Sequence, residues 1–185
     1  MRRLLEPTPR AIHALPIGIT LAIITAGAAL AADKCKMRWD TTPAGDTKYT
    51  QRQVLDAGDV AGHQTRFYEF HRVYSNDRPN CEGLKRVETW VRGYADLIDL
   101  SGPTWGYAVT TLEGGDKIFS KWSGISLTVV TPDGSNATTT ESTALWTGGT
   151  GKYLGIRGVE VDHTTSDVDK GLNQYSGEVE YWFNK

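Results

Sequence analysis

The stretch TWGYAVTTLEGGDKIFSKWSGISLTVV, residues 104–130, points to the fold class of this chain. Two runs rich in Trp, Tyr, Val, Ile and Thr flank the turn Glu113-Gly114-Gly115-Asp116. Runs of this composition that end at Gly and Asp are typical of β-strands, and short Gly-containing connections join neighbouring antiparallel strands. We therefore expect a β-hairpin with strands at Thr104–Leu112 and Lys117–Val130.

The same pattern continues on both sides of this hairpin from residue 36 onward, and no segment shows a sustained helical period. Six further strands are expected, at Lys48–Leu55, Thr65–Ser75, Leu84–Ile98, Thr138–Trp146, Tyr153–Thr164 and Gln174–Phe183. Eight antiparallel strands joined by short turns form either an open sandwich or a closed barrel. Because closure removes exposed edges, we favour an all-β, eight-stranded antiparallel up-and-down barrel. Such an interior either fills with side chains or holds one small ligand.

Four segments carry a further signal. They are Gly106-Tyr107-Ala108-Val109, Gly115-Asp116-Lys117-Ile118-Phe119, the Gly-rich hairpin over residues 148–158, and Gly177-Glu178-Val179-Glu180-Tyr181. Together they resemble the allene oxide cyclase and dirigent barrel family over roughly residues 84–183. The resemblance implies an eight-stranded antiparallel barrel with a largely apolar cavity. Known members steer the cyclisation or coupling of reactive small molecules, often as oligomers. The resemblance assigns no catalytic residue to this chain.

Composition excludes several classes of protein. The 185 residues include 20 Lys and Arg against 22 Asp and Glu, and 39% of residues are hydrophobic. A net charge of −2 does not suit a polybasic nucleic-acid or lipid-surface binder. The Gly151-Lys152 pair does not belong to a phosphate-binding loop, because Trp146 and Tyr153 stand where such a loop needs Gly and Ser or Thr. We expect no cofactor, no metal and no nucleic-acid partner.

The N-terminus predicts export. Arg2, Arg3 and Arg10 precede an apolar run over residues 11–32, and Ala29-Leu30-Ala31 has the small-x-small pattern of a signal-peptidase site. We expect residues 1–31 to be a signal peptide and residues 32–185 to form one barrel domain, secreted or periplasmic and free of the membrane after cleavage. An uncleaved anchor is the alternative, since the run is about long enough to span a bilayer.

The predicted mature chain has two cysteines, Cys35 and Cys81. In an oxidising compartment two such residues are expected to form a disulfide. Two unrelated thiols are the alternative. Neither cysteine has a His or a second Cys at metal-ligand spacing, so the sequence gives no indication of a zinc site.

Candidate site residues follow from register. If each hairpin is symmetric about the centre of its turn, residues equally far from that centre face each other. This mirror rule pairs His71 with Val87, Val91 with Val109 and Tyr107 with Trp122. The resulting inner face comprises Phe67, Glu69, His71, Val73, Val87, Thr89, Val91, Trp105, Tyr107, Val109, Ile118, Ser120 and Trp122.

On this face Glu69 and His71 are two titratable groups two residues apart on one strand, among aromatic side chains. Burial raises the pKa of a Glu and lowers that of a His, which suits general acid–base catalysis, with Tyr107 as a hydroxyl donor. Phe67, Trp105, Val109 and Trp122 are expected to line the ligand site. An ordinary polar pair near the barrel rim is the alternative for Glu69 and His71. Asp162, Asp167 and Asp169 lack the spacing of a calcium loop and predict a solvated turn.

Two function classes stay open. The first is an exported cavity protein, enzymatic or not, that holds a small apolar or aromatic molecule, with cyclisation or isomerisation as the reaction. The second is a structural or protein-interaction barrel with a filled interior and a functional outer face. Either is compatible with a homo-oligomer. An enclosed pocket of several hundred Å³ with a few convergent polar groups favours the first class.

Overall fold

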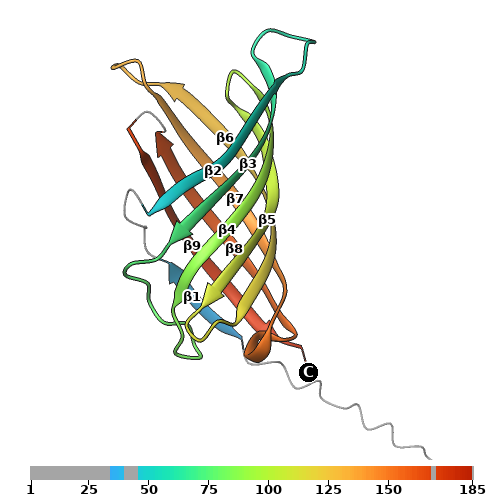
Figure 1. The fold of residues 1–185 in the computed structure, drawn as a ribbon, viewed down its shortest axis with the longest axis vertical. Coiled ribbons are helices and arrows are strands. Elements are labelled where there is room, and N and C mark those ends of the chain that lie inside the picture. The colour runs from blue at the N-terminus through green and yellow to red at the C-terminus, as the bar shows by residue number, and fades with distance from the viewer. Residues whose placement is uncertain (1–33, 40–45, 168–169, 185) are drawn as a thin grey trace, which may run out of the picture. The chain divides into compact units, whose positions relative to one another are not determined.

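The computed structural model describes residues 34–39, 46–167 and 170–184 (Figure 1). These residues form one antiparallel sheet of nine strands. The strands are β1 (Cys35–Trp39), β2 (Thr47–Asp56), β3 (His63–Val73), β4 (Arg86–Ile98), β5 (Gly102–Leu112), β6 (Lys117–Val130), β7 (Asn136–Gly149), β8 (Ile156–Asp167) and β9 (Leu172–Phe183). A 3-10 helix, η1 (Gly151–Tyr153), precedes β8. The expected signal peptide and its cleavage site lie outside the described residues.

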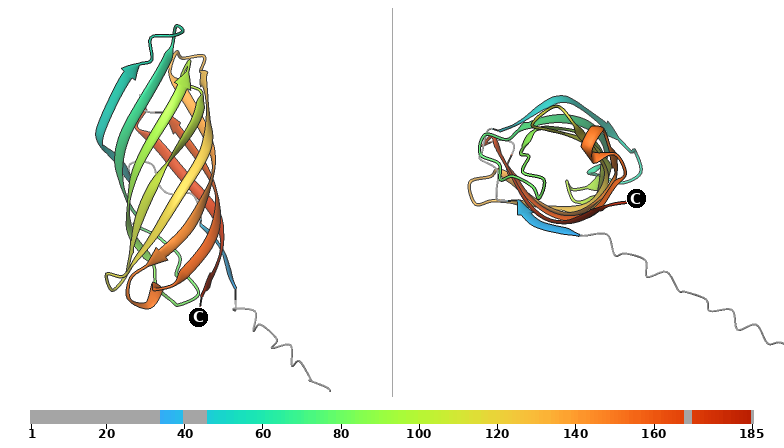
Figure 2. Two further views of the ribbon diagram at one scale, coloured as in Figure 1. Left: turned by 90° about the vertical axis from the view of Figure 1, so that its right-hand side faces the viewer. Right: turned by 90° about the horizontal axis from the view of Figure 1, so that it is seen from below.

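The strand order is β1-β9-β8-β7-β6-β5-β4-β3-β2, so β2 to β9 form a meander and β1 adds to β9. The sheet curls around a central space (Figure 2). Each of the eight expected strands has its counterpart in β2 to β9, which confirms the all-β antiparallel prediction. Two details differ. A ninth strand, β1, precedes the eight, and no backbone pairing joins β1 to β2 at the sheet's two edges within the described residues.

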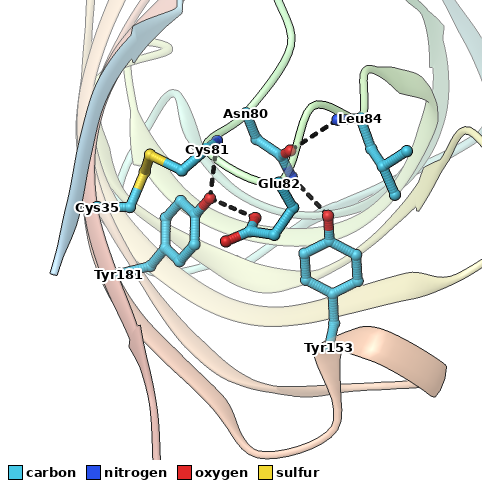
Figure 3. Close-up of a disulfide and its surroundings, with 7 residues drawn as sticks. All are labelled: Cys35, Asn80, Cys81, Glu82, Leu84, Tyr153 and Tyr181. Carbon is cyan, nitrogen blue, oxygen red and sulfur yellow. Dashed lines mark hydrogen bonds between the residues drawn. A yellow bond between two sulfur atoms is a disulfide. The ribbon is translucent and has the colours of Figure 1, made fainter. Parts of the chain in front are cut away.

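A buried apolar cluster fills one end of the curled sheet. Its members are Cys35, Trp39, Leu112, Ile118, Trp146, Tyr153, Ile156, Val179 and Tyr181. Residues 74–85, which connect β3 to β4, pack onto this end, where Asn80 Nδ2 donates to Tyr153 Oη at 2.6 Å (Figure 3). The largest fully buried side chains of the described residues, Tyr153, Tyr181, Leu112 and Ile156, all belong to this cluster.

A disulfide joins Cys35 of β1 to Cys81 in the connecting segment, which confirms the expected pairing. Tyr181 of β9 reinforces the link (Figure 3). Its hydroxyl accepts from the Cys81 backbone N–H at 3.2 Å and donates to Glu82 Oε2 at 2.6 Å. The short strand β1 is thus tied to the body of the protein by a covalent bond as well as by its ladder with β9.

Arg86, which lines the cavity, forms a buried ion pair with Asp77. Arg86 Nη2 lies 2.8 Å from Asp77 Oδ1 and its Nε lies 2.9 Å from Asp77 Oδ2, with both side chains 6% exposed. The guanidinium also stacks 3.6 Å from the Trp39 ring centroid and 4.0 Å from that of Tyr74. A two-point contact of this kind satisfies a buried charge that would otherwise be costly.

Candidate functional site

The curled sheet surrounds a cavity of about 330 Å³ that is partly open to solvent and is lined by residues from all nine strands. The cavity exists because small side chains occupy inner positions near the middles of β4 to β7. These positions are Ala95, Ala108, Ser120, Ser142 and Ala144 on the cavity wall. With larger residues there, an interior of this width would fill completely.

Glycine on β4 makes room for an aromatic side chain from β3. A Cβ at Gly93 would lie 2.3 Å from Cζ of Tyr68, so only glycine lets this ring lie against the wall. The Tyr68 hydroxyl hydrogen-bonds to Thr104 Oγ1 at 2.8 Å, and Thr104 donates to the Tyr94 carbonyl. Burial raises the pKa of Tyr68, so this wall residue is a neutral phenol.

Two carboxyl groups of β8 point into the cavity, since Glu160 and Asp162 are two residues apart on the inner face. Tyr175 of β9 connects them: its hydroxyl lies 2.9 Å from Asp162 Oδ1 and hydrogen-bonds to Glu160 Oε1. Trp146 Nε1 donates to Glu160 Oε2 at 2.8 Å. The three side chains Glu160, Asp162 and Tyr175 are called the carboxyl cluster below.

The carboxyl cluster holds a proton that isolated carboxylates would lose. Glu160 and Asp162 are each only 7% exposed. Desolvation and then the nearby charge of Glu160 raise the pKa of Asp162 to about 8, against the smaller opposing effects of the Tyr175 hydrogen bond and the Arg72 charge. The Tyr175 hydroxyl has one proton and can donate it to only one of the two carboxyl groups at a time. A second proton is therefore required for both contacts to be hydrogen bonds. The cluster can therefore donate and accept protons near neutral pH.

Three arginines line the cavity on β2 and β3, and one of them, Arg72, lies close to the carboxyl cluster, with its guanidinium 4.6 Å from the Tyr175 ring centroid. Arg52, Arg66 and Arg72 line the cavity around Tyr49. Arg72 donates to Asn173 Oδ1 and Thr47 Oγ1 at 2.9 Å, and Arg66 donates to Gln64 Oε1 at 2.9 Å. These are neutral acceptors. Within the described residues none of the three arginines has a carboxylate at ion-pair distance.

The predicted site residues of β3 are on the outer face of the sheet. Tyr68, Phe70 and Arg72 line the cavity, so Phe67, Glu69 and His71 point the other way. The placement expected for these three residues was therefore wrong.

Glu69 and His71 do share a face, as expected, but each has its own partner there. Glu69 Oε2 pairs with Arg92 Nη2 at 2.9 Å. His71 Nε2 lies 2.7 Å from Glu88 Oε2, and its ring stacks on Trp90 with centroids 4.3 Å apart. Neither group is directed at the cavity.

The predicted residues of β5 show the same inversion. Ala108 lines the cavity, so Trp105, Tyr107 and Val109 lie on the outer face, with Trp105 43% and Tyr107 53% exposed. Trp122 of β6 does line the cavity, as expected. Trp122 was assigned to the correct face and the predicted residues of β3 and β5 to the wrong face because the strand register differs from the expected one.

Sequence reasoning missed the carboxyl cluster. Asp162 is buried on a strand instead of lying in a solvated turn. Valines stand at 159 and 161 beside the acids at 160 and 162, and the valines occupy the outer face. Two acids alternating with valines on a predicted strand were the available signal, but apolar residues are ordinarily assigned to the inside.

No protein-family model, curated protein or solved structure matches this chain. Among the described residues no group of three or more His, Cys, Asp or Glu side chains is arranged to hold a metal ion. That same part of the chain contains no helix long and apolar enough to cross a membrane.

Proposed function

We propose that this protein holds a small aromatic molecule in the cavity of its curled sheet. The observation that carries the proposal is the 330 Å³ cavity itself, whose wall combines aromatic rings with a few charged groups. Small-molecule sites have volumes of roughly 300–1,000 Å³ and the same mixture of apolar lining and convergent polar groups. Tyr49, Tyr68, Phe70, Trp122 and Tyr175 supply the aromatic surface.

We also propose that the sheet functions as a barrel, as the resemblance to allene oxide cyclase and dirigent proteins implies. β1 pairs only with residues 177–181 of β9, which leaves a seam between residues 172–176 and β2. Side chains cross this seam: Arg72 bridges Asn173 of β9 and Thr47 of β2. In this proposal side-chain contacts, not a continuous backbone ladder, close the barrel.

Export to an oxidising compartment is part of the proposal. The N-terminal leader pattern motivates it, and the Cys35–Cys81 disulfide is consistent with a secreted or periplasmic protein. The expected intact mass of the exported protein corresponds to a chain that begins at Ala32 or Asp33. A mass that includes residues 1–31 would reject the cleavage.

Cavity filling tests the binding proposal. Ala108→Phe places a ring in the cavity, whereas Val109→Phe places the same ring on the outer face of the same strand. We expect the neutral fluorescent probe N-phenyl-1-naphthylamine to bind the wild type and Val109→Phe, and to bind Ala108→Phe at least ten-fold more weakly. Ala144→Leu is a second, smaller filling variant should Ala108→Phe not fold. Equal binding by the folded filling variants and the wild type would reject the cavity as the site.

A second candidate function, catalysis of a proton shift in the bound molecule, rests on the carboxyl cluster. Glu160 and Asp162 take the acid–base role expected earlier of Glu69 and His71, with Tyr175 in the place of Tyr107. Glu160 would accept a proton from a carbon next to a carbonyl while Asp162 gives its proton to the carbonyl oxygen. Reversal of both transfers at the same or another carbon restores both groups, so no oxidant or cofactor is needed.

The ketone 2-tetralone in deuterium oxide provides the assay for this activity. We expect wild-type protein to exchange its C1 hydrogens at least ten-fold faster than Glu160→Gln, as measured by mass spectrometry. Glu178→Gln, which changes an exposed acid on the outer face of β9, should match the wild type. If the wild type is no faster than Glu160→Gln, the protein is a binder without this activity.

The outer face supports an interaction role as the alternative function. Large apolar side chains are exposed across β5 to β8, among them Trp105, Tyr107, Leu127, Leu145 and Val161. Exposed apolar side chains in this number favour an interaction site, and a homo-oligomer is the simplest partner. Light scattering after gel filtration should then give a multiple of the mature mass, and Trp105→Ser with Leu145→Ser should reduce it to one chain. A monomeric wild type would reject this role.

A further inference from the structure

The unpaired polar atoms of the protein interior are all of one kind. Within the described residues three buried side-chain polar atoms have no hydrogen-bond partner: Nε1 of Trp39, Nε of Arg66 and Nε1 of Trp122. Each belongs to a residue on the cavity wall, and Trp39 is only 2% exposed. All three are N–H donors. Because buried donors without acceptors are rare and costly, the cavity is matched to a molecule that brings acceptors.

The charge of the cavity wall also favours a ligand that carries hydrogen-bond acceptors. Asp77 neutralises Arg86, but Arg52, Arg66 and Arg72 have no carboxylate at ion-pair distance within the described residues. Against these three cations the described part of the wall carries only the carboxyl cluster, in which burial raises the pKa of Asp162. The cavity is therefore electropositive inside a chain whose net charge is −2.

Arg52 and Arg66 are the two cations best placed to hold one anion together. They occupy neighbouring inner positions on β2 and β3, since Arg52 pairs with Tyr68 and Arg66 pairs with Val54. Burial, and then the charge of Arg52, lower the pKa of Arg66. Two guanidinium groups that repel each other across a wall with no carboxylate between them form a site for a planar, two-oxygen anion.

We propose that the cavity ligand is an aromatic carboxylate, with its carboxylate on Arg52 and Arg66 and its ring against the aromatic wall. This inference rests on the proposed binding function and specifies the ligand class of the same site. The positions of the charges also orient the ligand. Glu160 on β8 repels a carboxylate, so the anionic end lies toward β2 and β3 and the ring lies toward the carboxyl cluster.

Two probes that differ in charge but share one ring system test whether the cavity prefers an anionic ligand. 2-Naphthoate and 2-naphthamide have the same ring system and nearly the same shape, and only the first is an anion at neutral pH. Titration calorimetry with the full mature protein should show 2-naphthoate binding at least ten-fold more tightly than 2-naphthamide. The preference should weaken as salt concentration rises, because screening acts on the charged probe alone.

Single substitutions then test whether Arg52 and Arg66 cause the preference for 2-naphthoate. Arg66→Gln and Arg52→Gln should each reduce the affinity for 2-naphthoate five-fold or more while changing that for 2-naphthamide less than two-fold. Trp122→Phe, which keeps an aromatic ring and removes one unpaired donor, should weaken both probes a few-fold. Arg92→Gln is the control, because Arg92 is an exposed outer-face arginine on β4. It should leave both affinities unchanged.

The possible results separate the two levels of the proposal. If 2-naphthamide binds as tightly as 2-naphthoate, or if the preference survives in the Arg52→Gln/Arg66→Gln double variant, the carboxylate assignment is wrong and the binding function stands. If neither naphthalene probe nor N-phenyl-1-naphthylamine binds the wild type, the binding function itself is wrong. Loss of the preference in Arg92→Gln would also overturn the assignment to Arg52 and Arg66.

Discussion

Asp162 is the residue whose environment departs most from what its type suggests. An aspartate on a strand of a small protein is ordinarily ionised, yet burial beside Glu160 raises the pKa of Asp162 to about 8. The folded state therefore binds a proton that the unfolded chain releases above its ordinary value of 3.8. Between these values the unfolded state binds fewer protons, so this group makes stability fall as pH rises.

Asp162→Asn keeps the size of the side chain and removes its titration. We expect the free energy of unfolding of the wild type to decrease relative to this variant between pH 5 and pH 8. The slope of the difference should approach about 1.4 kcal/mol per pH unit. Urea titrations at several pH values measure it, and Glu178→Gln, at an exposed site, should follow the wild type. Parallel curves for wild type and Asp162→Asn would show that Asp162 is ionised throughout.

Asp77 gives a second prediction at the residue scale. Asp77→Ala leaves Arg86 charged, buried and without its carboxylate, which should lower the free energy of unfolding by about 3–5 kcal/mol. Adding Arg86→Met removes the stranded charge, so the double variant should recover a large part of the loss. Chemical denaturation of the two variants checks this. A double variant less stable than Asp77→Ala would mean that stacking of Arg86 on Trp39 dominates over the ion pair.

Strand register explains, at the scale of elements, why the predicted faces of β3 and β5 were inverted. The mirror rule placed Val91 opposite Val109 and Tyr107 opposite Trp122, whereas the structure pairs Val91 with Ala108 and Tyr107 with Lys121. Each hairpin is displaced by one residue, which exchanges the two faces of one strand in the pair. The third case, His71, pairs with Trp90 and is displaced by an odd number of residues as well. Errors that exchange faces cancel at every second strand, so Thr89 and Val91 of β4 and the predicted residues of β6 line the cavity as expected. Val87 of β4 does not: it is 46% exposed, because the bulge between Arg86 and Glu88 places Arg86 on the cavity wall instead.

The tether of β1 provides the prediction at this scale. Cys35→Ser with Cys81→Ser removes a cross-link between residues 46 apart in sequence. We expect the free energy of unfolding to fall by about 2–5 kcal/mol, because the unfolded chain gains conformational entropy. Residues 74–85 should also become more sensitive to limited proteolysis, since they then lose their covalent link to β1 and keep only non-covalent contacts with the apolar end. Unchanged stability in the double variant would show that the ladder between β1 and β9 is sufficient.

The open seam is a property of the whole molecule. β2 has one backbone partner and exposed side chains along most of its length, whereas β6 and β7 lie in the interior of the sheet. Hydrogen exchange followed by mass spectrometry should therefore find fast exchange over β2 and slow exchange over β6 and β7. Protection of β2 equal to that of β6 would mean that the second edge of β2 also has a backbone partner, and would contradict the open seam.

The sequence by itself determined eight of the nine strands, their antiparallel order and the disulfide. These features depend on local signals: β-branched and aromatic runs, Gly and Asp at turns, and a single pair of cysteines. Only the tertiary structure decided which face of each strand points inward, and hence that Glu160 and Asp162 lie inside while Glu69 and His71 lie outside. The physical reason is that both faces carry apolar residues, so alternation gives no preference. Which face of a strand points inward then depends on the exact number of residues in the turn and on bulges such as that between Phe119 and Ser120.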